Sequence, residues 1–310
     1  MLQPTEKPVT EMTTGDSPGV RHSPLEDALE AFLRTLDGKN RSQATIRAYQ
    51  ADLLQFLDFL RESNYTAEDP ADVTREDVTE YLSHLANLGL SGVSRARKLA
   101  AVREYFRFLE GNGSIGRSPA AGIDTPKKER NIRTYLMPDE FTRMLSLAGA
   151  SPRDYAILQV FLQTGVRVSE LCALRLADVD VAGQVLRVTS GKGMVARDIP
   201  LEKKAILAIK NWLAIRSAVA SDYLFLNYSG APLGERGVRK LVTKYRVEAG
   251  ITRKASCHSL RHTFATYKAE RGVSPFQLQQ WLGHANLNTT QIYVHMGRQN
   301  GKKVMNATSL

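Results

Sequence analysis

Apolar residues recur at intervals of three and four along most of the chain, the spacing that places side chains on one face of an α-helix. In residues 24–110, two predicted helices carry apolar faces formed by Leu29, Phe32, Leu33 and Leu36 and by Leu53, Leu54, Phe56, Leu57 and Leu60. Ser42 is a candidate N-cap for the second helix, and the stretch from Thr74 to Asp77 predicts the capped start of a third. Residues 24–110 are therefore expected to form a helical domain.

A fourth predicted helix, from about Gly92 to Glu110, combines an apolar stripe with a strongly basic face. The stripe consists of Leu99, Val102, Phe106 and Leu109. The basic face carries Arg95, Arg97, Lys98, Arg103 and Arg107. Such a face is either a solvated helix surface or a surface that lies against DNA phosphates. Arg95, Lys98 and Arg103 are taken as the DNA-binding candidates of this helix.

Two segments show neither helical periodicity nor strand alternation. Residues 1–23 are rich in Pro, Thr, Ser and Gly and have almost no large apolar side chains, which predicts a disordered tail. Residues 111–133 contain Gly and Pro residues together with a basic cluster, which predicts a linker between two domains. The cluster adds Lys127, Lys128 and Arg130 to the DNA-binding candidates.

The remaining residues, 134–310, are predicted to form a larger, mostly helical domain with a β insertion. Polarity alternates from Val185 to Thr189 and from Val195 to Ile199, on either side of a Ser-Gly-Lys-Gly turn, as is typical of a β-hairpin. Residues 236–254 are rich in basic side chains, and this stretch adds the DNA-binding candidates Arg239, Lys240 and Lys244. The expected fold class is mainly α with a small β-sheet insertion, in two domains.

The charge balance of the chain favours a polyanionic partner. The 310-residue chain has 42 Lys and Arg against 32 Asp and Glu, a formal net charge of +10. Cys172 and Cys257 are its two cysteines, which imply neither a disulfide framework nor a metal cluster and fit a reducing cytoplasm. Because no apolar run is long enough for a membrane span or a signal peptide, we expect a soluble, cytoplasmic protein.

Two arginines of the second domain lie in settings suited to phosphate binding. Arg167 follows a glycine-marked bend in the stretch TGVRVSEL, where a helix restarts and a guanidinium can bind a phosphate in bidentate fashion. The alternative role for Arg167 is an ion pair with Glu170. Arg261 lies in the stretch HSLRH, in which helical spacing brings His258, Arg261 and His262 to one side.

Two further stretches supply a lysine, a histidine and a tyrosine. Lys192 lies between two glycines at the tip of the predicted hairpin, where its ammonium can reach into a groove. His284 precedes Tyr293 in the stretch LGHANLNTTQIYVH. A metal site at His258, His262 and His284 is a competing interpretation, but the sequence lacks the intervening Glu of the zinc-protease pattern and a further carboxylate nearby. We therefore predict no metal site.

These stretches together resemble the tyrosine recombinase, or phage integrase, family, with Xer-type recombinases as the nearest relatives. The resemblance rests on TGVRVSEL around Arg167, Lys192 in a hairpin turn, HSLRH at 258–262, LGHAN at 282–286 and TTQIYVH at 289–295. It covers roughly residues 24–310 and implies a SAM-like core-binding domain at 24–110. It also implies a catalytic tyrosine recombinase domain at 134–310, with the two domains closing on double-stranded DNA like a clamp.

The resemblance also implies a role for each site residue. Tyr293 is the expected nucleophile, which forms a 3′-phosphotyrosyl link and frees a 5′-hydroxyl. Arg167 and Arg261 are expected to stabilise the charge on the phosphate, and Lys192 to protonate the leaving oxygen. His258 is expected to accept or shuttle the tyrosine proton and His284 to hydrogen-bond the phosphate. The reaction needs no cofactor, metal or ATP.

Two other functions would use the same fold. One is a DNA-binding accessory protein that does not cut, and the other is a topoisomerase of type IB that relaxes DNA without recombining it. Within the recombinase interpretation, chromosome-dimer resolution and integration or excision of a mobile element remain alternatives. The family resemblance implies self-association to a tetramer on DNA, in which residues 294–310 often dock on a neighbouring protomer. A disordered end is the alternative for this tail, and the expected location is the nucleoid.

Overall fold

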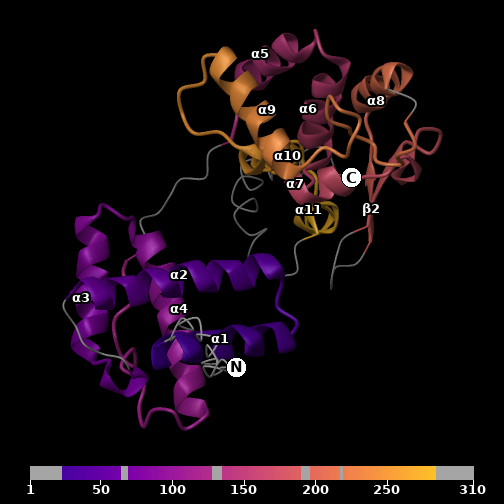
Figure 1. The fold of residues 1–310 in the computed structure, drawn as a ribbon. Helices are drawn as coiled ribbons and strands as arrows, with labels where there is room; N and C mark the ends of the chain where they lie inside the picture. Colours follow the sequence, from indigo (N-terminus) through magenta and orange to yellow (C-terminus); the bar gives the residue numbers. More distant parts are fainter. Residues whose placement is uncertain (1–22, 64–68, 128–134, 190–195, 217–218, 284–310) are drawn as a thin grey trace, which may run out of the picture. The chain divides into compact units, whose positions relative to one another are not determined.

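The computed structural model of the chain describes residues 23–63, 69–127, 135–189, 196–216 and 219–283. The chain folds into two compact units, Met1–Asn131 and Ile132–Leu310 (Figure 1). Each unit has its own apolar core. The described elements are helices and a small sheet, so the predicted fold class is confirmed. The predicted disordered tail, residues 1–23, lies outside the described residues except for Ser23.

The first unit is built from helices whose starts follow the predicted capping signals. Its elements are α1 (Pro24–Gly38), α2 (Gln43–Glu62), the short 3-10 helix η1 (Pro70–Asp72), α3 (Arg75–Asn87) and α4 (Gly92–Gly111). The Ser42 hydroxyl accepts a hydrogen bond from the backbone N–H of Thr45, and Thr74 forms a reciprocal capping box with Asp77. These side chains satisfy amides that a helix start leaves without a backbone partner.

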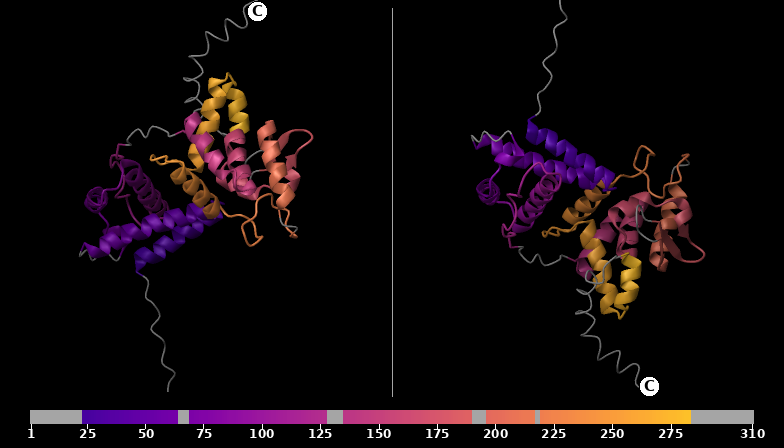
Figure 2. Two further views of the ribbon diagram at one scale, coloured as in Figure 1. Left: turned by 90° about the horizontal axis from the view of Figure 1, so that it is seen from above. Right: turned by 90° about the horizontal axis from the view of Figure 1, so that it is seen from below.

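The core of the first unit is rich in aromatic rings. α1 and α2 run side by side in the views of Figures 1 and 2, and both pack against α4. The Phe32 ring meets the Tyr105 ring edge-on at 5.7 Å between centroids, and the Phe56 ring meets the Tyr81 ring edge-on at 5.1 Å. Edge-to-face pairs of this kind add to the apolar area that the helices bury. The predicted apolar faces therefore point into this core, except at Leu54. Leu54 is 39% exposed, because it lies one position beyond the face formed by Leu53, Phe56, Leu57 and Leu60.

A buried ion pair crosses the same core. The Lys98 ammonium donates to Asp52 Oδ1 at 2.8 Å, and both residues are less than a tenth exposed. Arg97 also pairs with Asp52. A buried carboxylate and ammonium hold each other in place because neither has enough water around it. This pair fixes α2 against α4.

The described part of the predicted linker packs on the first unit. Ile115, Ala120 and Ile123 are buried in its core. The Arg75 guanidinium donates to the backbone carbonyls of Ala121 and Gly122, both at 3.1 Å. Residues 111–127 therefore form part of the first unit, while residues 128–133 lie outside the described residues.

The second unit combines helices with a small sheet. Its helices are α5 (Pro138–Ala148), α6 (Pro152–Thr164), α7 (Val168–Ala173), the 3-10 helix η2 (Leu176–Asp178), α8 (Lys203–Ile215), α9 (Glu235–Glu248), α10 (Cys257–Glu270) and α11 (Pro275–Leu282). α6 packs against α5, α8 and α10. Its residues Ile157, Leu158 and Phe161 are fully buried, because α6 is surrounded by other helices.

The strands form an antiparallel sheet in the order β1-β2-β3. Their bounds are β1 (Val179–Asp180), β2 (Val185–Val188) and β3 (Arg197–Pro200). Leu186 pairs with Ile199 and Val188 with Arg197. The hairpin predicted from the alternation is confirmed, while β1 is an additional short strand that the alternation does not show. The turn with Lys192 lies outside the described residues.

We expect Asp52→Ala to lower the free energy of unfolding of the first unit by about 3 kcal/mol, because the Lys98 ammonium would remain buried without its carboxylate. Hydrogen exchange of the α2 and α4 amides measures this change in the full chain. Asp58→Ala is the control, since Asp58 is exposed on the same helix and pairs with the exposed Arg61 at 3.5 Å. Equal protection in both variants would contradict the assigned role of the buried pair.

Candidate active site

Arg167 occupies the position at which one helix ends and the next begins. α6 ends at Thr164 and is capped by Gly165, which has a left-handed backbone with φ of 62°, and Arg167 is the N-cap of α7. The bend and the helix restart predicted from the sequence are therefore confirmed. A side chain at Gly165 would be strained by the left-handed backbone. Its Cβ would also lie 2.4 Å from Cδ1 of Phe264, a contact too short for real atoms.

Arg261 reaches the same place from α10. Its Nη1 donates to the carbonyl of Gly165 at 2.7 Å, and its Nη2 donates to the carbonyl of Leu282 at 2.5 Å. The residue is only 4% exposed. The guanidinium therefore joins the end of α6 to the end of α11.

Three arginines bind three consecutive carbonyls at the end of α11. Arg197 Nε donates to Trp281 at 2.7 Å, Arg261 donates to Leu282, and Arg167 Nη2 donates to Gly283 at 3.1 Å. The last carbonyls of a helix have no partner within the helix and carry its negative dipole end, which favours cations. We call Arg167, Arg197 and Arg261 the arginine cluster.

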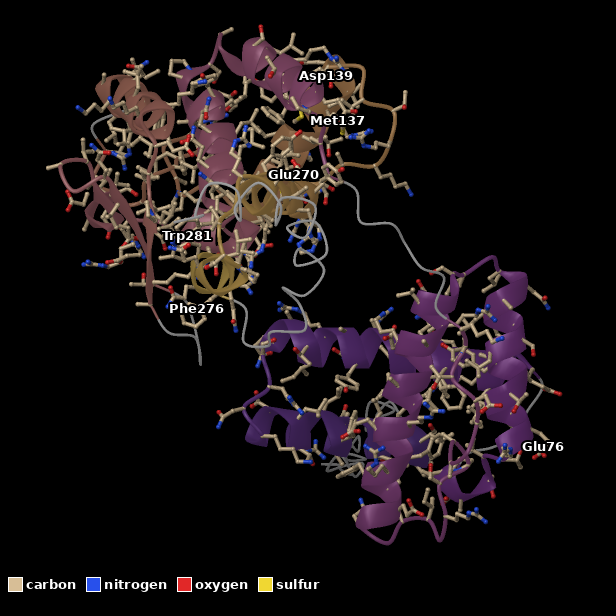
Figure 3. The ribbon with its side chains drawn as sticks, turned by 180° about the vertical axis from the view of Figure 1, so that it is seen from behind. Glu76, Met137, Asp139, Glu270, Phe276 and Trp281 are labelled. Carbon is tan, nitrogen blue, oxygen red and sulfur yellow. The ribbon has the colours of Figure 1, made fainter. Side chains whose placement is uncertain are left out.

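α11 is anchored through its side chains as well. Figure 3 shows Trp281 on the side of α11 that faces the rest of the second unit, where it packs against Phe264, whereas Phe276 projects away. Phe276 is 65% exposed. Gly283 ends the helix with a left-handed backbone, and its N–H donates to the carbonyl of Gln279 at 2.9 Å. The direction in which the chain leaves α11 is thus fixed at Gly283.

Glu170 joins two members of the cluster. Its Oε1 and Oε2 accept from Nη1 and Nη2 of Arg197 at 3.0 and 2.8 Å, and Oε1 also accepts from Arg167 Nη1 at 2.9 Å. Burial by itself would raise the pKa of Glu170, but hydrogen bonds and charge from Arg197 and Arg167 outweigh burial and hold this pKa below its ordinary value. Glu170 is therefore ionised, and two guanidinium groups share one carboxylate.

The ion pair with Glu170, which the sequence leaves as the alternative role for Arg167, is present. This ion pair leaves part of the Arg167 guanidinium accessible, because the Arg167 side chain is 36% exposed, whereas that of Arg197 is 8% exposed. A guanidinium has five N–H groups in a planar fork. Arg167 can therefore hold Glu170 and Gly283 and still approach a phosphate from the exposed side.

The two histidines of α10 differ in exposure. His258 is exposed and His262 is buried, and their rings meet edge-on at 4.5 Å between centroids. The neighbouring thiol of Cys257 is a poor nucleophile, because burial raises its pKa to about 11. The i, i+4 pairing predicted for the histidines is confirmed, with His258 on the solvent side.

Three predicted site residues, Lys192, His284 and Tyr293, lie outside the described residues. For His284 and Lys192, a nearby residue or element in the sequence is described. His284 directly follows Gly283, whose carbonyl Arg167 binds. β3, which carries Arg197, is the strand that follows the turn with Lys192. The structure thus brings together Arg167 and Arg261, and it fixes the chain next to His284.

Arg197 is a member of the cluster that the sequence motifs do not reveal. The predicted alternation of the second hairpin strand places Arg197 on the same face as Val195 and Ile199. An arginine between two apolar residues on an inward face is the signal that could have found it. Ile199 is buried and Arg197 is nearly so.

The DNA-binding candidates fall into three groups. On α4, Arg95 is half-buried, Arg103 donates to Thr125 Oγ1 at 2.9 Å and to the carbonyl of Ile123, and Lys98 is held by Asp52 inside the core. The exposed candidates are Lys127 and, on α9, Arg239, Lys240 and Lys244. Lys128 and Arg130 lie outside the described residues. Lys98 is therefore a residue of the core, and its ammonium cannot reach a phosphate on the surface.

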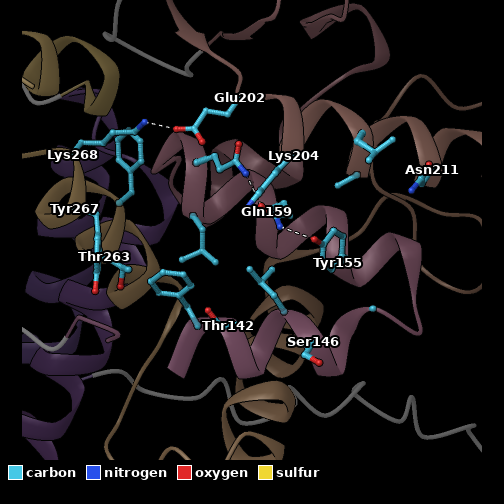
Figure 4. A pocket seen from close by; sticks show the side chains of 18 of the residues that line it. Thr142, Ser146, Tyr155, Gln159, Glu202, Lys204, Asn211, Thr263, Tyr267 and Lys268 are labelled. Atoms are coloured by element: carbon cyan, nitrogen blue, oxygen red, sulfur yellow. Dashed lines mark hydrogen bonds and ion pairs between the residues drawn. The ribbon is translucent and has the colours of Figure 1, made fainter. Parts of the chain in front are cut away.

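A cavity of about 770 Å³ lies apart from the cluster, between α5, α6, α8 and α10 (Figure 4). Leu145, Leu162 and Phe264 form part of its apolar wall. Its polar rim includes Lys268, which pairs with Glu202 at 2.5 Å. None of the three cluster arginines lines it.

No described helix is long and apolar enough to cross a membrane. In the same part of the chain, no group of three or more His, Cys, Asp and Glu side chains is placed to hold a metal ion.

Comparisons with known proteins identify the family. The phage integrase family matches residues 134–300, and the N-terminal SAM-like domain of phage integrases matches residues 29–113. The chain therefore belongs to the phage integrase family. Within this family it is 38% identical over 283 residues to the tyrosine recombinase XerC of Pelobacter propionicus, which covers 88% of this chain and 92% of that protein. The resemblance inferred from the motifs is confirmed.

Solved structures show the same fold. The XerH site-specific recombinase bound to its palindromic difH substrate has a TM-score of 0.75 and 21% identity, covering 94% of this chain and 98% of that chain. The Tn1549 transposon integrase in complex with a circular intermediate DNA has a TM-score of 0.74 and 18% identity, covering 89% and 99%. At these identities the likeness concerns the fold.

We expect Gly165→Ala to lower the free energy of unfolding of the second unit by about 3 kcal/mol, because the Cβ would add a clash with Phe264 to the left-handed backbone. Urea unfolding followed by tryptophan fluorescence measures this change, since both tryptophans, Trp212 and Trp281, belong to the second unit. Gly250→Ala is a matched control with φ of 68° and open space around the Cβ, and should cost about 1 kcal/mol. Equal losses would show that packing at Gly165 is unimportant.

Proposed function

We propose that this chain is a site-specific DNA recombinase that cuts and rejoins DNA strands through a 3′-phosphotyrosyl intermediate. The observation that carries the proposal is the arginine cluster in a chain of the phage integrase family. Arg167 and Arg261 lie together at the end of α11, and Arg167 is accessible from solvent. Fixed cations at one point are suited to the charge of a phosphate in its transition state.

The reaction assigns one step to each residue. The Tyr293 oxygen attacks the phosphorus, the bond from phosphorus to the 5′-oxygen breaks, and Lys192 gives its proton to that oxygen. Arg167 and Arg261 bind the nonbridging oxygens, His258 takes the proton of Tyr293, and His284 hydrogen-bonds the phosphate. The phosphotyrosyl ester that forms is close in free energy to the phosphodiester that breaks. A 5′-hydroxyl from a partner strand then attacks the phosphotyrosine, so neither ATP nor a metal enters the scheme.

Double-stranded DNA is the proposed partner. The Tn1549 integrase, whose fold is similar, was determined in complex with DNA. Residues 24–127 form the proposed core-binding domain and residues 134–310 the proposed catalytic domain. The proposed phosphate contacts are Arg95, Arg103, Lys127, Lys128, Arg130, Arg239, Lys240 and Lys244. Lys98 is left out because it is buried against Asp52.

The active form on DNA is proposed to be a tetramer that joins two duplexes, since exchange of strands requires two sites to be cut. The site of action is the DNA of the nucleoid. Recombinant products from two cognate sites would support this assignment. Relaxation of supercoiled DNA without recombinants would instead indicate a topoisomerase.

Tyr293→Phe should abolish the covalent complex and leave DNA binding within about twofold, because only the attacking oxygen is lost. The test is capture of protein on nicked suicide DNA sites, followed by denaturing electrophoresis and sequencing of the trapped strands. Tyr228→Phe is the matched control, since Tyr228 is 91% exposed and lies outside the site. A covalent adduct that persists in Tyr293→Phe would place the nucleophile elsewhere.

Arg167→Ala should slow single-turnover cleavage by about 10²- to 10³-fold, the typical effect of removing one preorganised donor of charge. The variant should still fold, because Arg197 continues to pair with Glu170. Arg187→Ala is the control, since Arg187 is an exposed arginine of β2 that pairs with Asp198. Cleavage by Arg167→Ala at a rate near that of the control would remove Arg167 from the proposed site.

A further inference from the structure

Arg197 lies where three parts of the second unit meet. It belongs to β3, it binds both oxygens of Glu170, and it donates to the carbonyl of Trp281 near the end of α11. Gly283 leaves room for this guanidinium, since a Cβ there would lie 3.0 Å from Arg197 Nη1. A single planar fork thus ties β3, α7 and α11 together.

We propose that Arg197 is a positioning residue for the strand-cleavage reaction, acting through Glu170 on Arg167 and through Trp281 on the end of α11. This inference rests on the proposed function. In this role Arg197 acts through its contacts with Glu170 and Trp281 and not through the DNA.

The effect on Arg167 follows from the sharing of one carboxylate. Glu170 Oε1 accepts from both Arg167 Nη1 and Arg197 Nη1, while Oε2 accepts from Arg197 Nη2 and from the backbone N–H of Arg167 at 2.7 Å. The bidentate pair with Arg197 fixes the plane of the carboxylate. That plane in turn sets the direction in which Arg167 points.

The effect on the end of α11 follows from the contact of Arg197 with the Trp281 carbonyl. Trp281, Leu282 and Gly283 each give their carbonyl to a different arginine of the cluster. Arg197 is the member of this set that also belongs to the strand following the Lys192 turn. Loss of the Arg197 guanidinium would therefore remove the contact between β3 and the end of α11, while the contacts of Arg261 to Gly165 and Leu282 remain.

The decisive experiment compares Arg197→Gln and Arg197→Lys with the wild-type protein and with the control Arg187→Gln. Single-turnover covalent-complex formation on a suicide DNA site, DNA affinity and thermal unfolding are measured for each full chain. We expect Arg197→Gln to slow cleavage at least tenfold with DNA affinity within about twofold of wild type, and Arg187→Gln to leave all three unchanged. Cleavage by Arg197→Gln at the rate of the control would overturn the assignment.

Arg197→Lys keeps the positive charge beside Glu170 and therefore protects the fold if the glutamine variant is unstable. A single ammonium cannot reproduce the planar fork that joins Glu170 to Trp281. We expect this variant to fold and bind DNA as the wild type does and yet cleave at least fivefold more slowly. A wild-type cleavage rate would show that charge alone suffices and would overturn the proposal.

A second substrate separates positioning from a general structural defect. A methylphosphonate at the cleaved position lacks the charge of one nonbridging oxygen and needs less help from Arg167. If Arg197 acts through Arg167, the slowing caused by Arg197→Gln should be smaller on this substrate than on the phosphate. Equal slowing on the phosphate and the methylphosphonate substrates would overturn the proposed action of Arg197 through Arg167.

The wild-type protein reports on the proposed function in the same assay. Failure of the wild type to form a covalent complex on the phosphate site would overturn the proposed function and the role of Arg197 together. Cleavage by the wild type with unchanged rates in both Arg197 variants would overturn only the role of Arg197.

Discussion

The end of α11 is the constraint on which the second unit depends. A helix leaves its last carbonyls without partners, and a buried carbonyl without a partner is costly. Here Arg197, Arg261 and Arg167 supply the missing donors in order along the chain. The three arginines come from β3, α10 and the start of α7, so a single helix end joins elements that are distant in the sequence.

This arrangement would let Arg167 and Arg261 stabilise the fold and also serve the proposed chemistry. Their contacts to peptide carbonyls hold each guanidinium rigidly without neutralising its charge, since a carbonyl is a dipole and not an anion. Within the part of the chain that the structure describes, Glu170 is the residue that brings a full negative charge to Arg167 and Arg197. The guanidinium of Arg167 is therefore held in place with a positive potential at its exposed edge before DNA binds. Phosphate transfer is favoured by charges that are preorganised in this way.

Much of the fold and part of the site could be predicted from the sequence. The capped starts at Ser42 and Thr74, the hairpin and the helix restart at Arg167 follow from local rules that act within a few residues. The burial of Lys98 could not be predicted, because it depends on Asp52, which is distant in the sequence. The contact of Arg197 with the Trp281 carbonyl could not be predicted either, because a peptide carbonyl is not specified by any side chain. In the sequence, Arg197 is marked only by its position on the inward face of a predicted strand.

The packing of residues 111–127 on the first unit has a practical consequence. Ile115 and Ile123 fill the core beside α4, and Arg75 and Arg103 bind backbone carbonyls of the same segment. A fragment that stopped at Glu110 would expose this apolar surface and would be prone to aggregate. A fragment for separate expression should therefore extend through Lys127.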